Sequence, residues 1–472
     1  MTTGRLVLPA LRWREDGDFA HEAAAIEAAL EFGAGGFILF GGTTESVRSL
    51  TDRLRRDAGR PLLIASDLER GAGQQVRGLA ELPPPLALSA LEEPAVIRGA
   101  GLLTAAEALS VGINWVLAPV ADLDIEPENP IVQTRSFGGD PLQVGDAVAS
   151  WVAGCEAGGA LACAKHFPGH GRTVRDSHHA VPVVTASVEE LERDCVPFRA
   201  AIAAGVSTVM TAHVAYPALD PTGNPATFSQ PILQRLRDPM GFAGLIVSDA
   251  LMMGGAQAGR TTTGAALAAL GAGVDLLLYP DDPVAVAEAL SLSAQRDPQI
   301  AARVQDSLVR YERALRVVEA NRIPDLEVHA GSASALGDWL LTRSMVRGAP
   351  PRLQQPLEIE VVDDDLGGVW PPSSAGTIVA QTLAAGGMTL GPGGSRVLVI
   401  LAEPRGFKGR ARLGEESHRM VAARAPGADL VVVCGHPRLA NGLPGEAPVL
   451  LAWHRQALMQ QSVARWLMEH LA

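Results

Sequence analysis

Eight short apolar runs, separated by longer stretches with helical periodicity, constrain the fold of this chain more than any other feature of its sequence. The runs occupy residues 5–9, 36–40, 61–65, 113–119, 160–164, 207–212, 244–248 and 274–279. The Ala-rich stretches between them, such as 19–32 and 143–157, repeat apolar residues every three or four positions, as an amphipathic helix does. Strands of a parallel sheet that are buried on both faces are almost continuously apolar. The alternation therefore predicts the α/β class and a (β/α)8 TIM-type barrel, with an open doubly wound sheet as the alternative.

A change of pattern after residue 320 predicts a second domain. Residues 299–319 read as a long helix, and residues 321–334 are polar and irregular, which is typical of a linker. Further apolar runs at 357–362, 397–402, 430–434 and 449–453 alternate with helical stretches, and a last helix is expected over 456–471. We therefore expect a catalytic barrel domain over 1–320, a linker over 321–334 and a smaller α/β sandwich domain over 335–472.

The composition restricts the partners that the chain can have. Its 472 residues are 47% apolar and carry a net charge of −13, so a large core is available, while the acidic balance disfavours nucleic acid as a partner. The N-terminus lacks a basic segment followed by a long apolar stretch, and no run reaches the ~18 apolar residues that a membrane span needs. Four scattered cysteines are predicted to be reduced core thiols, at Cys155, Cys163, Cys195 and Cys434. These features predict a cytoplasmic protein with no nucleic-acid or membrane partner, and they leave its oligomeric state open.

Ionisable residues follow six of the eight apolar runs. They are Asp67 and Glu69 after the third run, Asp122 and Arg135 after the fourth, Lys165, His166, Asp176 and His178 after the fifth, and His213, Asp249 and Asp281 after the last three. In a (β/α)8 barrel the active site lies at the carboxyl ends of the strands. Any one of these residues could be a solvated loop charge, but six strand ends together predict a site.

Asp249 is the candidate nucleophile. It follows the apolar run 244–248, so its carboxylate is expected to point into the mouth of the barrel. Cleavage of a glycoside through a covalent intermediate needs a rigid carboxylate beneath the anomeric carbon. The alternative is a structural Asp that accepts hydrogen bonds from backbone amides.

Four residues are candidate ligands for a sugar. Lys165 and His166 are adjacent just after the fifth run, and Arg135 and Asp67 follow the fourth and the third. Sugar hydroxyls both donate and accept hydrogen bonds, so a mixed set of cations and a carboxylate suits them. An ordinary ion-pair cluster is the alternative.

The loop over 169–182 carries the candidate acid/base. Asp176 and His178 are two residues apart, a spacing that lets the carboxylate orient the imidazole and stabilise its cation. A histidine paired in this way can protonate a leaving oxygen and later deprotonate water. Glycines in the loop permit hinge-like backbone angles, so the pair could move in after the substrate binds.

Long motifs around these residues resemble those of a known family. Residues 165–171 read Lys-His-Phe-Pro-Gly-His-Gly and are followed by Asp-Ser-His at 176–178. This combination is similar to the hallmark of the β-N-acetylglucosaminidases of glycoside hydrolase family 3, the NagZ-like branch. Residues 129–141 and 247–251 also resemble the family, and the resemblance covers roughly residues 7–279.

The resemblance implies a (β/α)8 barrel and a retaining mechanism without a metal or a cofactor. In that mechanism Asp249 is the nucleophile, and His178 with Asp176 is the acid/base. The resemblance also implies a set of sugar-binding positions, at Asp67, Arg77, Arg135, Lys165 and His166.

Several positions depart from the family pattern, among them the opening strand at residues 5–9. Residues 67–77 carry two extra residues that displace an arginine, so either Arg77 or Arg70 is expected to contact the sugar. Arg172 stands in the loop where an Asp is common, and His179 is additional. These changes are expected to alter the side of the site that binds the leaving group.

The resemblance implies an exo-acting enzyme that releases terminal N-acetylglucosamine from cell-wall muropeptide fragments, as in peptidoglycan recycling, or from chitooligosaccharides. The alternatives are an N-acetylglucosamine-specific phosphorylase, since a neutral histidine does not repel phosphate, and a broader-specificity β-glucosidase of the same family. A metal hydrolase would instead use histidines and an aspartate of one region, at His166, His170, Asp176, His178 and His179. An inactive sugar-binding protein is the non-enzymatic alternative.

Overall fold

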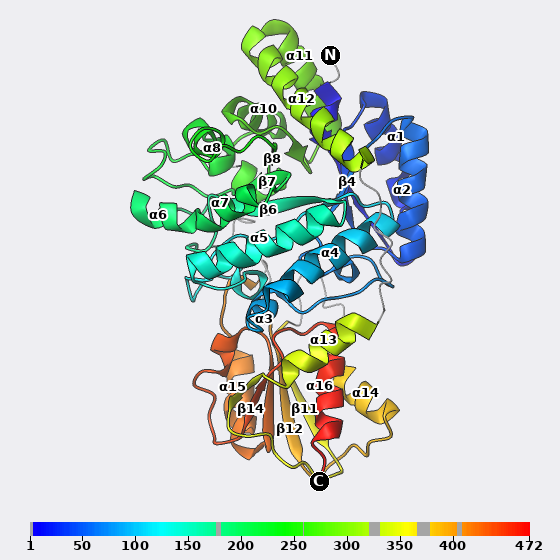
Figure 1. Ribbon diagram of the computed structural model, residues 1–472, viewed down its shortest axis with the longest axis vertical. Helices are drawn as coiled ribbons and strands as arrows, with labels where there is room; N and C mark the ends of the chain where they lie inside the picture. Colours follow the sequence, from blue (N-terminus) through cyan, green and yellow to red (C-terminus); the bar gives the residue numbers. More distant parts are fainter. Residues whose placement is uncertain (1–2, 176–180, 258, 321–330, 366–377, 404–407) are drawn as a thin grey trace. The chain divides into compact units, whose positions relative to one another are not determined.

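The computed structural model describes residues 3–175, 181–257, 259–320, 331–365, 378–403 and 408–472 (Figure 1). The chain forms two compact units. The first comprises Met1–Ala80, Glu93–Ile125 and Ser136–Glu327, and the second comprises Glu81–Glu92, Glu126–Arg135 and Val328–Ala472. Two short segments from the range predicted as the barrel domain therefore group with the second unit.

The first unit is built on a curled parallel sheet. Within the described residues its seven strands follow one another in chain order: β2 (Ala10–Arg12), β3 (Gly36–Phe40), β4 (Leu63–Ser66), β5 (Trp115–Val116), β6 (Leu161–Phe167), β7 (Thr208–Thr211) and β8 (Leu245–Val247). A further parallel pair joins β1 (Val7–Leu8) to β9 (Leu277–Leu278), and only Pro9 separates β1 from β2. A bridge between Val247 and Leu276 connects β8 to the start of β9. The other strands fall on the eight predicted runs, whereas β2 begins just after the run 5–9, and the pairings confirm the predicted barrel.

Helices follow the strands of this unit and cover the outside of its sheet (Figure 1). They are α1 (Ala23–Phe32), α2 (Thr44–Ala58), α4 (Pro94–Ser110), α5 (Pro141–Ala157), α6 (Val188–Asp194), α7 (Val196–Ala203), α8 (Gln230–Arg237), α9 (Gly254–Gln257), α10 (Thr262–Ala272), α11 (Pro283–Arg296) and α12 (Pro298–Ala320). Several begin at residues that satisfy the free backbone N–H groups of a first turn. Asp140, for example, accepts from the N–H groups of Leu142 and Gln143, and Pro141 occupies the first position of α5.

The helices α4 and α5 pack in close contact because glycines lie where they cross. A Cβ atom on Gly101 of α4 would lie 2.3 Å from the carbonyl oxygen of Trp151, and one on Gly154 of α5 would lie 2.0 Å from that of Arg98. Both distances are far below van der Waals contact. The Gly- and Ala-rich sequence of these helices therefore allows their backbones to touch.

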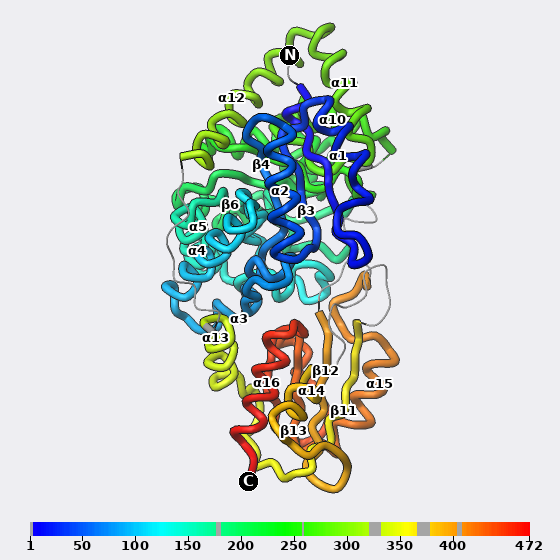
Figure 2. Tube along the Cα trace, turned by 90° about the vertical axis from the view of Figure 1, so that its right-hand side faces the viewer, coloured from blue at the N-terminus to red at the C-terminus, as the bar shows by residue number. Residues whose placement is uncertain are grey.

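The second unit is an open sheet of mixed direction between helices (Figure 2). Four parallel strands, β11 (Glu358–Asp363), β12 (Arg396–Leu401), β13 (Leu430–Cys434) and β14 (Val449–Leu451), lie in that order, and β10 (Met345–Arg347) pairs antiparallel with β14 at one edge. The helices α13 (Gly331–Leu341), α14 (Ile378–Ala385) and α16 (Ala457–Glu469) lie on one face, and α15 (Glu415–Arg424) lies on the other. The short α3 (Pro85–Ser89) also belongs to this unit.

The predicted sandwich domain is confirmed, with two differences. The four parallel strands match the predicted runs, whereas β10 was not predicted. The helix α13 begins at Gly331, inside the range predicted as a linker, and residues 321–330 lie outside the described part of the chain.

All four cysteines are buried and free, as predicted. Among the helices of the described residues, none combines the length and the apolar character needed to cross a membrane.

Candidate active site

The carboxyl ends of β4 and β6 bring together a buried lysine and two carboxylates. The Lys165 ammonium donates to Asp67 Oδ1 at 2.7 Å and lies 2.8 Å from Glu69 Oε1. Its side chain is only 2% exposed, whereas that of Asp67 is 30% exposed. A buried ammonium must be paired to be tolerated, and here two carboxylates pair it. Asp67 is thus the member of this triad that solvent, or a ligand, can reach.

Asp122 organises two histidines from the stretch that begins at the end of β6. Its Oδ2 accepts from His166 Nδ1 at 2.7 Å, and its Oδ1 accepts the backbone N–H groups of His166 at 3.1 Å and His170 at 2.7 Å. Burial alone would raise the pKa of the Asp122 carboxyl, but these contacts lower it overall. Asp122 therefore stays ionised and fixes the ring of His166 with Nδ1 protonated and Nε2 turned away from the pair.

His170 and His213 are neutral members of the same region. Burial lowers the pKa of His170 to about 4, and its Nδ1 lies 2.8 Å from the Thr173 hydroxyl. Burial also lowers the pKa of His213, whose Nε2 lies 3.2 Å from the carbonyl oxygen of Ala250. Since a carbonyl only accepts, the His213 proton is assigned to Nε2.

Asp249 follows β8 after one intervening residue, and its Oδ1 accepts the backbone N–H of Ala250 at 2.7 Å. This short bond fixes the carboxylate. The negative charge of Asp249 raises the pKa values of His170 and His213 against the effect of their burial. Asp249 therefore lies within electrostatic range of both rings.

The thiol of Cys163 on β6 is influenced by the charges of three predicted site residues. Burial, with the negative charges of Asp67 and Asp249, raises its pKa to about 12, while the hydroxyl of Thr208 and the charge of Lys165 oppose the rise. Water and salt screen a buried group from nearby charges only weakly. Asp67 after β4, Lys165 within β6 and Asp249 after β8 therefore all lie within electrostatic range of this thiol.

Two predicted residues have their printed contacts elsewhere, and two others lie outside the described part of the chain. Asp176 and His178 lie outside the described residues. Arg77 is exposed, with its guanidinium 3.1 Å from Glu15 and stacked over the ring of Trp13. Arg135 ends the short 3-10 helix Gln133–Arg135, which is part of the second unit, and its Nη1 lies 3.4 Å from the carbonyl oxygen of Ile131.

The structure gives roles to residues that follow the predicted strands but had no role in the predicted glycosidase site. They are Glu69, Asp122, His170 and His213, which complete or orient the predicted residues. Each follows an apolar run in the sequence, so the strand-end position was the available signal. Of the five residues that a metal hydrolase would use, three lie outside the described part of the chain.

Comparisons with known proteins relate both units to one group of proteins. Residues 10–314 match the sequence profile of the glycosyl hydrolase family 3 N-terminal domain. A β-hexosaminidase of Tolumonas auensis is 41% identical over 253 residues, which are 52% of this chain and 75% of that protein. A β-N-acetylglucosaminidase/β-glucosidase of Cellulomonas fimi is 38% identical over 256 residues, which are 52% of this chain but only 45% of that protein.

Solved structures extend the similarity to the second unit. A glycoside hydrolase family 3 β-N-acetylglucosaminidase from Paenibacillus sp. str. FPU-7 superimposes with a TM-score of 0.84 at 25% identity, over 100% of this chain and 96% of that one. The β-glucoside phosphorylase BglX superimposes with a TM-score of 0.83 over 99% of this chain and 91% of that one, but at 21% identity it supports the fold alone.

Proposed function

Because the chain belongs to glycosyl hydrolase family 3, we propose that it is a retaining, exo-acting β-N-acetylglucosaminidase that releases terminal N-acetylglucosamine from glycosides. The relatives named above support the sugar, since two of them carry the names β-hexosaminidase and β-N-acetylglucosaminidase/β-glucosidase. The geometry supports the chemistry, since the Asp249 carboxylate is fixed by a backbone N–H and Asp67 is held by Lys165 as an exposed acceptor for sugar hydroxyls.

The reaction proceeds in two displacements. In the first, Asp249 attacks the anomeric carbon, the glycosidic C–O bond breaks, and His178, oriented by Asp176, donates a proton to the leaving oxygen. In the second, water transfers a proton to His178 and attacks the same carbon, and the carboxylate of Asp249 leaves. The product keeps the β configuration.

The sugar is held by the polar groups around Asp249. Asp67 accepts hydrogen bonds from sugar hydroxyls, because its side chain is the exposed member of the Lys165 triad. Lys165 holds Asp67 in place through the 2.7 Å contact. His166 contributes its Nε2, since Asp122 occupies its Nδ1. Arg135 is a further proposed sugar ligand, and Arg70 and Arg77 remain the two candidates for the displaced arginine.

The observation that carries this proposal is the triad of Lys165, Asp67 and Glu69, whose member Asp67 is the exposed one. The test is turnover of p-nitrophenyl N-acetyl-β-glucosaminide by the wild type and by Asp249→Ala. We expect turnover by the wild type and a loss of at least about 10⁴-fold in the variant. A fully active Asp249→Ala protein would contradict the mechanism.

The acid/base is tested separately through the leaving group. His178→Ala should slow glycosides with poor leaving groups strongly, and p-nitrophenyl glycosides little, because a good leaving group needs no proton. Equal loss on both substrates would instead indicate a structural role.

Two arms of the same assay decide between the alternatives. A rate that depends on phosphate, with formation of the sugar 1-phosphate, would identify a phosphorylase. Comparable turnover of p-nitrophenyl β-glucoside would identify the broader specificity that the name of the Cellulomonas relative describes.

The natural substrate is proposed to be muropeptide fragments of the cell wall or chitooligosaccharides, encountered in the cytoplasm. Chromatography of digests of both substrate classes, with detection of released N-acetylglucosamine, tests the substrate. Cell fractionation tests the location.

A further inference from the structure

Asp275 is a fully buried carboxylate just before β9, and three arginines surround it. Nη2 of Arg237 lies 2.5 Å, Nη2 of Arg303 lies 2.7 Å and Nη1 of Arg310 lies 3.2 Å from its oxygens. Arg237 ends α8, and the other two arginines are seven residues apart on α12, so they share one face of that helix. Asp249 follows β8 at the carboxyl ends of the strands, so the two carboxylates lie at opposite ends of the barrel.

The oxygens of Asp275 already accept as many hydrogen bonds as they can hold. Oδ1 accepts from both arginines of α12 and from the Ser307 hydroxyl at 3.0 Å. Oδ2 accepts from Arg237 and from the backbone N–H of Ile246 at 2.9 Å. A carboxylate offers about four lone-pair sites. One saturated carboxylate therefore faces three guanidinium charges.

The arginines keep both charge and donors. Burial, together with the like charges of Arg310 and Arg303, lowers the pKa of Arg237 to about 10 against the effect of Asp275. Nη1 of Arg303 is buried and has no hydrogen-bond partner among the described residues. Arg310 is the most exposed of the three, at 27%, and within the same residues only its Nη1 forms a hydrogen bond. The cluster thus holds more donors than acceptors, which favours an added anion.

These three arginines line a cavity of about 190 Å³. Cavities for drug-sized ligands measure about 300–1,000 Å³, so this one suits a smaller ligand. Asp306, an exposed residue of α12, is the other charged side chain of the lining. Taken with Asp275, the three arginines and two carboxylates leave one positive charge.

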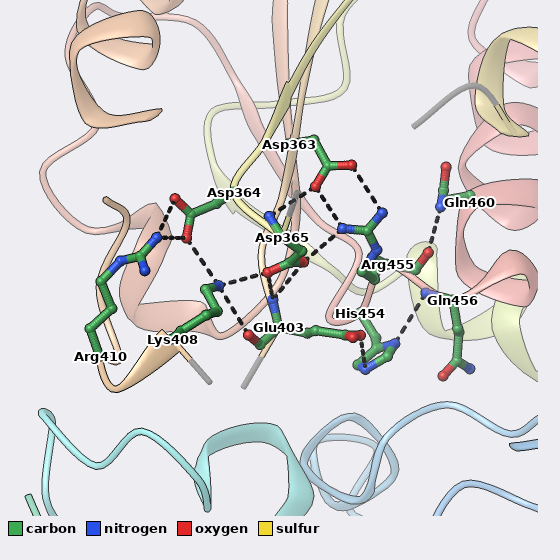
Figure 3. Close-up of polar contacts among 10 residues, drawn as sticks. All are labelled: Asp363, Asp364, Asp365, Glu403, Lys408, Arg410, His454, Arg455, Gln456 and Gln460. Atoms are coloured by element: carbon green, nitrogen blue, oxygen red, sulfur yellow. Dashed lines mark hydrogen bonds and ion pairs between the residues drawn. The ribbon is translucent and has the colours of Figure 1, made fainter. Parts of the chain in front are cut away.

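An ion cluster in the second unit shows a different balance (Figure 3). There three aspartates pair with three cations, so the charges of these residues cancel: Asp363, Asp364 and Asp365 with Lys408, Arg410 and Arg455. Around Asp275, in contrast, three arginines share one carboxylate. It is this excess, and not the presence of buried ion pairs, that indicates an anion site.

We propose that the cavity beside Asp275 binds a small oxyanion of the phosphate class, held by Arg310 and by the positive charge of Arg237 and Arg303. A guanidinium binds phosphate oxygens through two N–H groups in a fixed fork. Arg310 offers Nε and Nη2 in this way, because it contacts Asp275 through Nη1. The oxyanion would join α8 to α12 at the end of the barrel away from Asp249, so the site is separate from the proposed hydrolysis.

The proposal is tested by ³¹P NMR titration of inorganic phosphate with the full chain, at an ionic strength held constant with sodium chloride. We expect a dissociation constant on the order of 1 mM or tighter, and competition by sulfate. No binding up to about 10 mM phosphate, or displacement by chloride as effective as that by sulfate, would overturn the proposal.

Arg310→Gln tests the residue that holds the oxyanion. The variant should bind phosphate about tenfold more weakly or worse, while Asp275 keeps its contacts with Arg237 and Arg303. Arg316→Gln is the matched control, because Arg316 is an exposed residue of the same helix outside the lining, and it should bind like the wild type. Circular dichroism checks that both variants fold. Equal affinity in the two variants would overturn the proposal.

Asp306→Asn should have the opposite effect. Removing a negative charge from the lining should tighten phosphate binding by up to about fivefold, which a damaged fold could not do. Unchanged or weaker binding in this variant would place the phosphate elsewhere and overturn the proposal. Asp249→Ala should bind phosphate like the wild type, and loss of binding there would instead place the phosphate in the proposed active site.

Discussion

Asp122 holds His166 from two directions, through its Oδ2 to the ring Nδ1 at 2.7 Å and through its Oδ1 to the backbone N–H at 3.1 Å. The two residues are 44 positions apart in the chain. The carboxylate therefore determines both where the imidazole lies and which of its nitrogens carries the proton.

Asp122→Asn should separate these two effects. The amide oxygen can still accept the backbone N–H groups of His166 and His170, but its NH₂ group would face Nδ1 and force the proton onto Nε2. We expect kcat/KM to fall by about 10- to 100-fold, with a folded protein. Steady-state kinetics measures kcat/KM, and circular dichroism shows whether the variant is folded. Asp52→Asn, on an exposed residue of α2, is the control, and an Asp122→Asn enzyme as active as this control would refute the role.

Asp67→Asn should lower activity far more than stability. Lys165 would keep its contact with Glu69 at 2.8 Å, so the buried ammonium would stay paired. The sugar, however, would lose the charged acceptor, at a cost to kcat/KM of about 10- to 100-fold. Glu69→Gln is the matched variant, because its side chain is buried and should affect activity less. The opposite order of the two activity losses would show that Asp67 is not the sugar ligand.

Glu156 should make stability depend on pH. Burial raises the pKa of its carboxyl from 4.5 to about 7, although the backbone N–H of Ala162 and both the N–H and the hydroxyl of Ser207 donate to it. The pKa of Glu156 is higher in the folded state than in the unfolded state. Its contribution to the free energy of unfolding is therefore fully present below about pH 4.5 and is lost as the pH rises through about 7.

Glu156→Gln removes this dependence. We compare the free energy of unfolding of the variant with that of the wild type at each pH. The difference, variant minus wild type, should be more favourable to the variant at about pH 8 than at about pH 4, by on the order of 3 kcal/mol. Urea denaturation at both pH values measures the difference. Glu27→Gln, on an exposed residue of α1, should show no such gain. A constant difference between Glu156→Gln and the wild type would rule out the titration.

The contact of α4 with α5 predicts opposite effects for two glycines on one helix. Gly101→Ala places a Cβ 2.3 Å from a backbone oxygen and should lower the free energy of unfolding by about 1–3 kcal/mol. Gly99→Ala, with nothing within 4 Å, should raise it by about 0.5–1 kcal/mol through helix propensity. Thermal and urea unfolding compare them. A stabilising Gly101→Ala would mean that the helices separate easily.

The strands could be predicted from local sequence because a buried parallel strand is a nearly continuous run of apolar residues. The strand β3 (Gly36–Phe40) matches its predicted run residue for residue. In contrast, β10 (Met345–Arg347) has three residues that are only partly buried, so neither an apolar run nor an alternation marks it. Its pairing with β14 is decided by tertiary contact.

The sequence predicted which residues lie at the site, but it did not predict which of them form hydrogen bonds and ion pairs with one another. The strand-end rule placed Lys165 and Asp67 in one group although 98 residues separate them. Which strand-end side chains bond to each other depends on the register and curvature of the sheet, so the roles of Glu69 and Asp122 became visible only in the structure. The roles of Asp176 and His178 remain predictions from the family motif.

The path of the chain has a consequence for how this protein can be divided. The polypeptide passes between the two units at five places, after Ala80, Glu92, Ile125, Arg135 and Glu327. Truncation after residue 327 would remove Gln456, whose amide donates to the carbonyl oxygen of Leu82 at 2.6 Å, and would leave two internal loops without the unit in which they fold. The barrel of this protein is therefore not expected to fold as an independent domain. A related protein that lost the C-terminal portion would also need substitutions in these two loops, so that they fold without it.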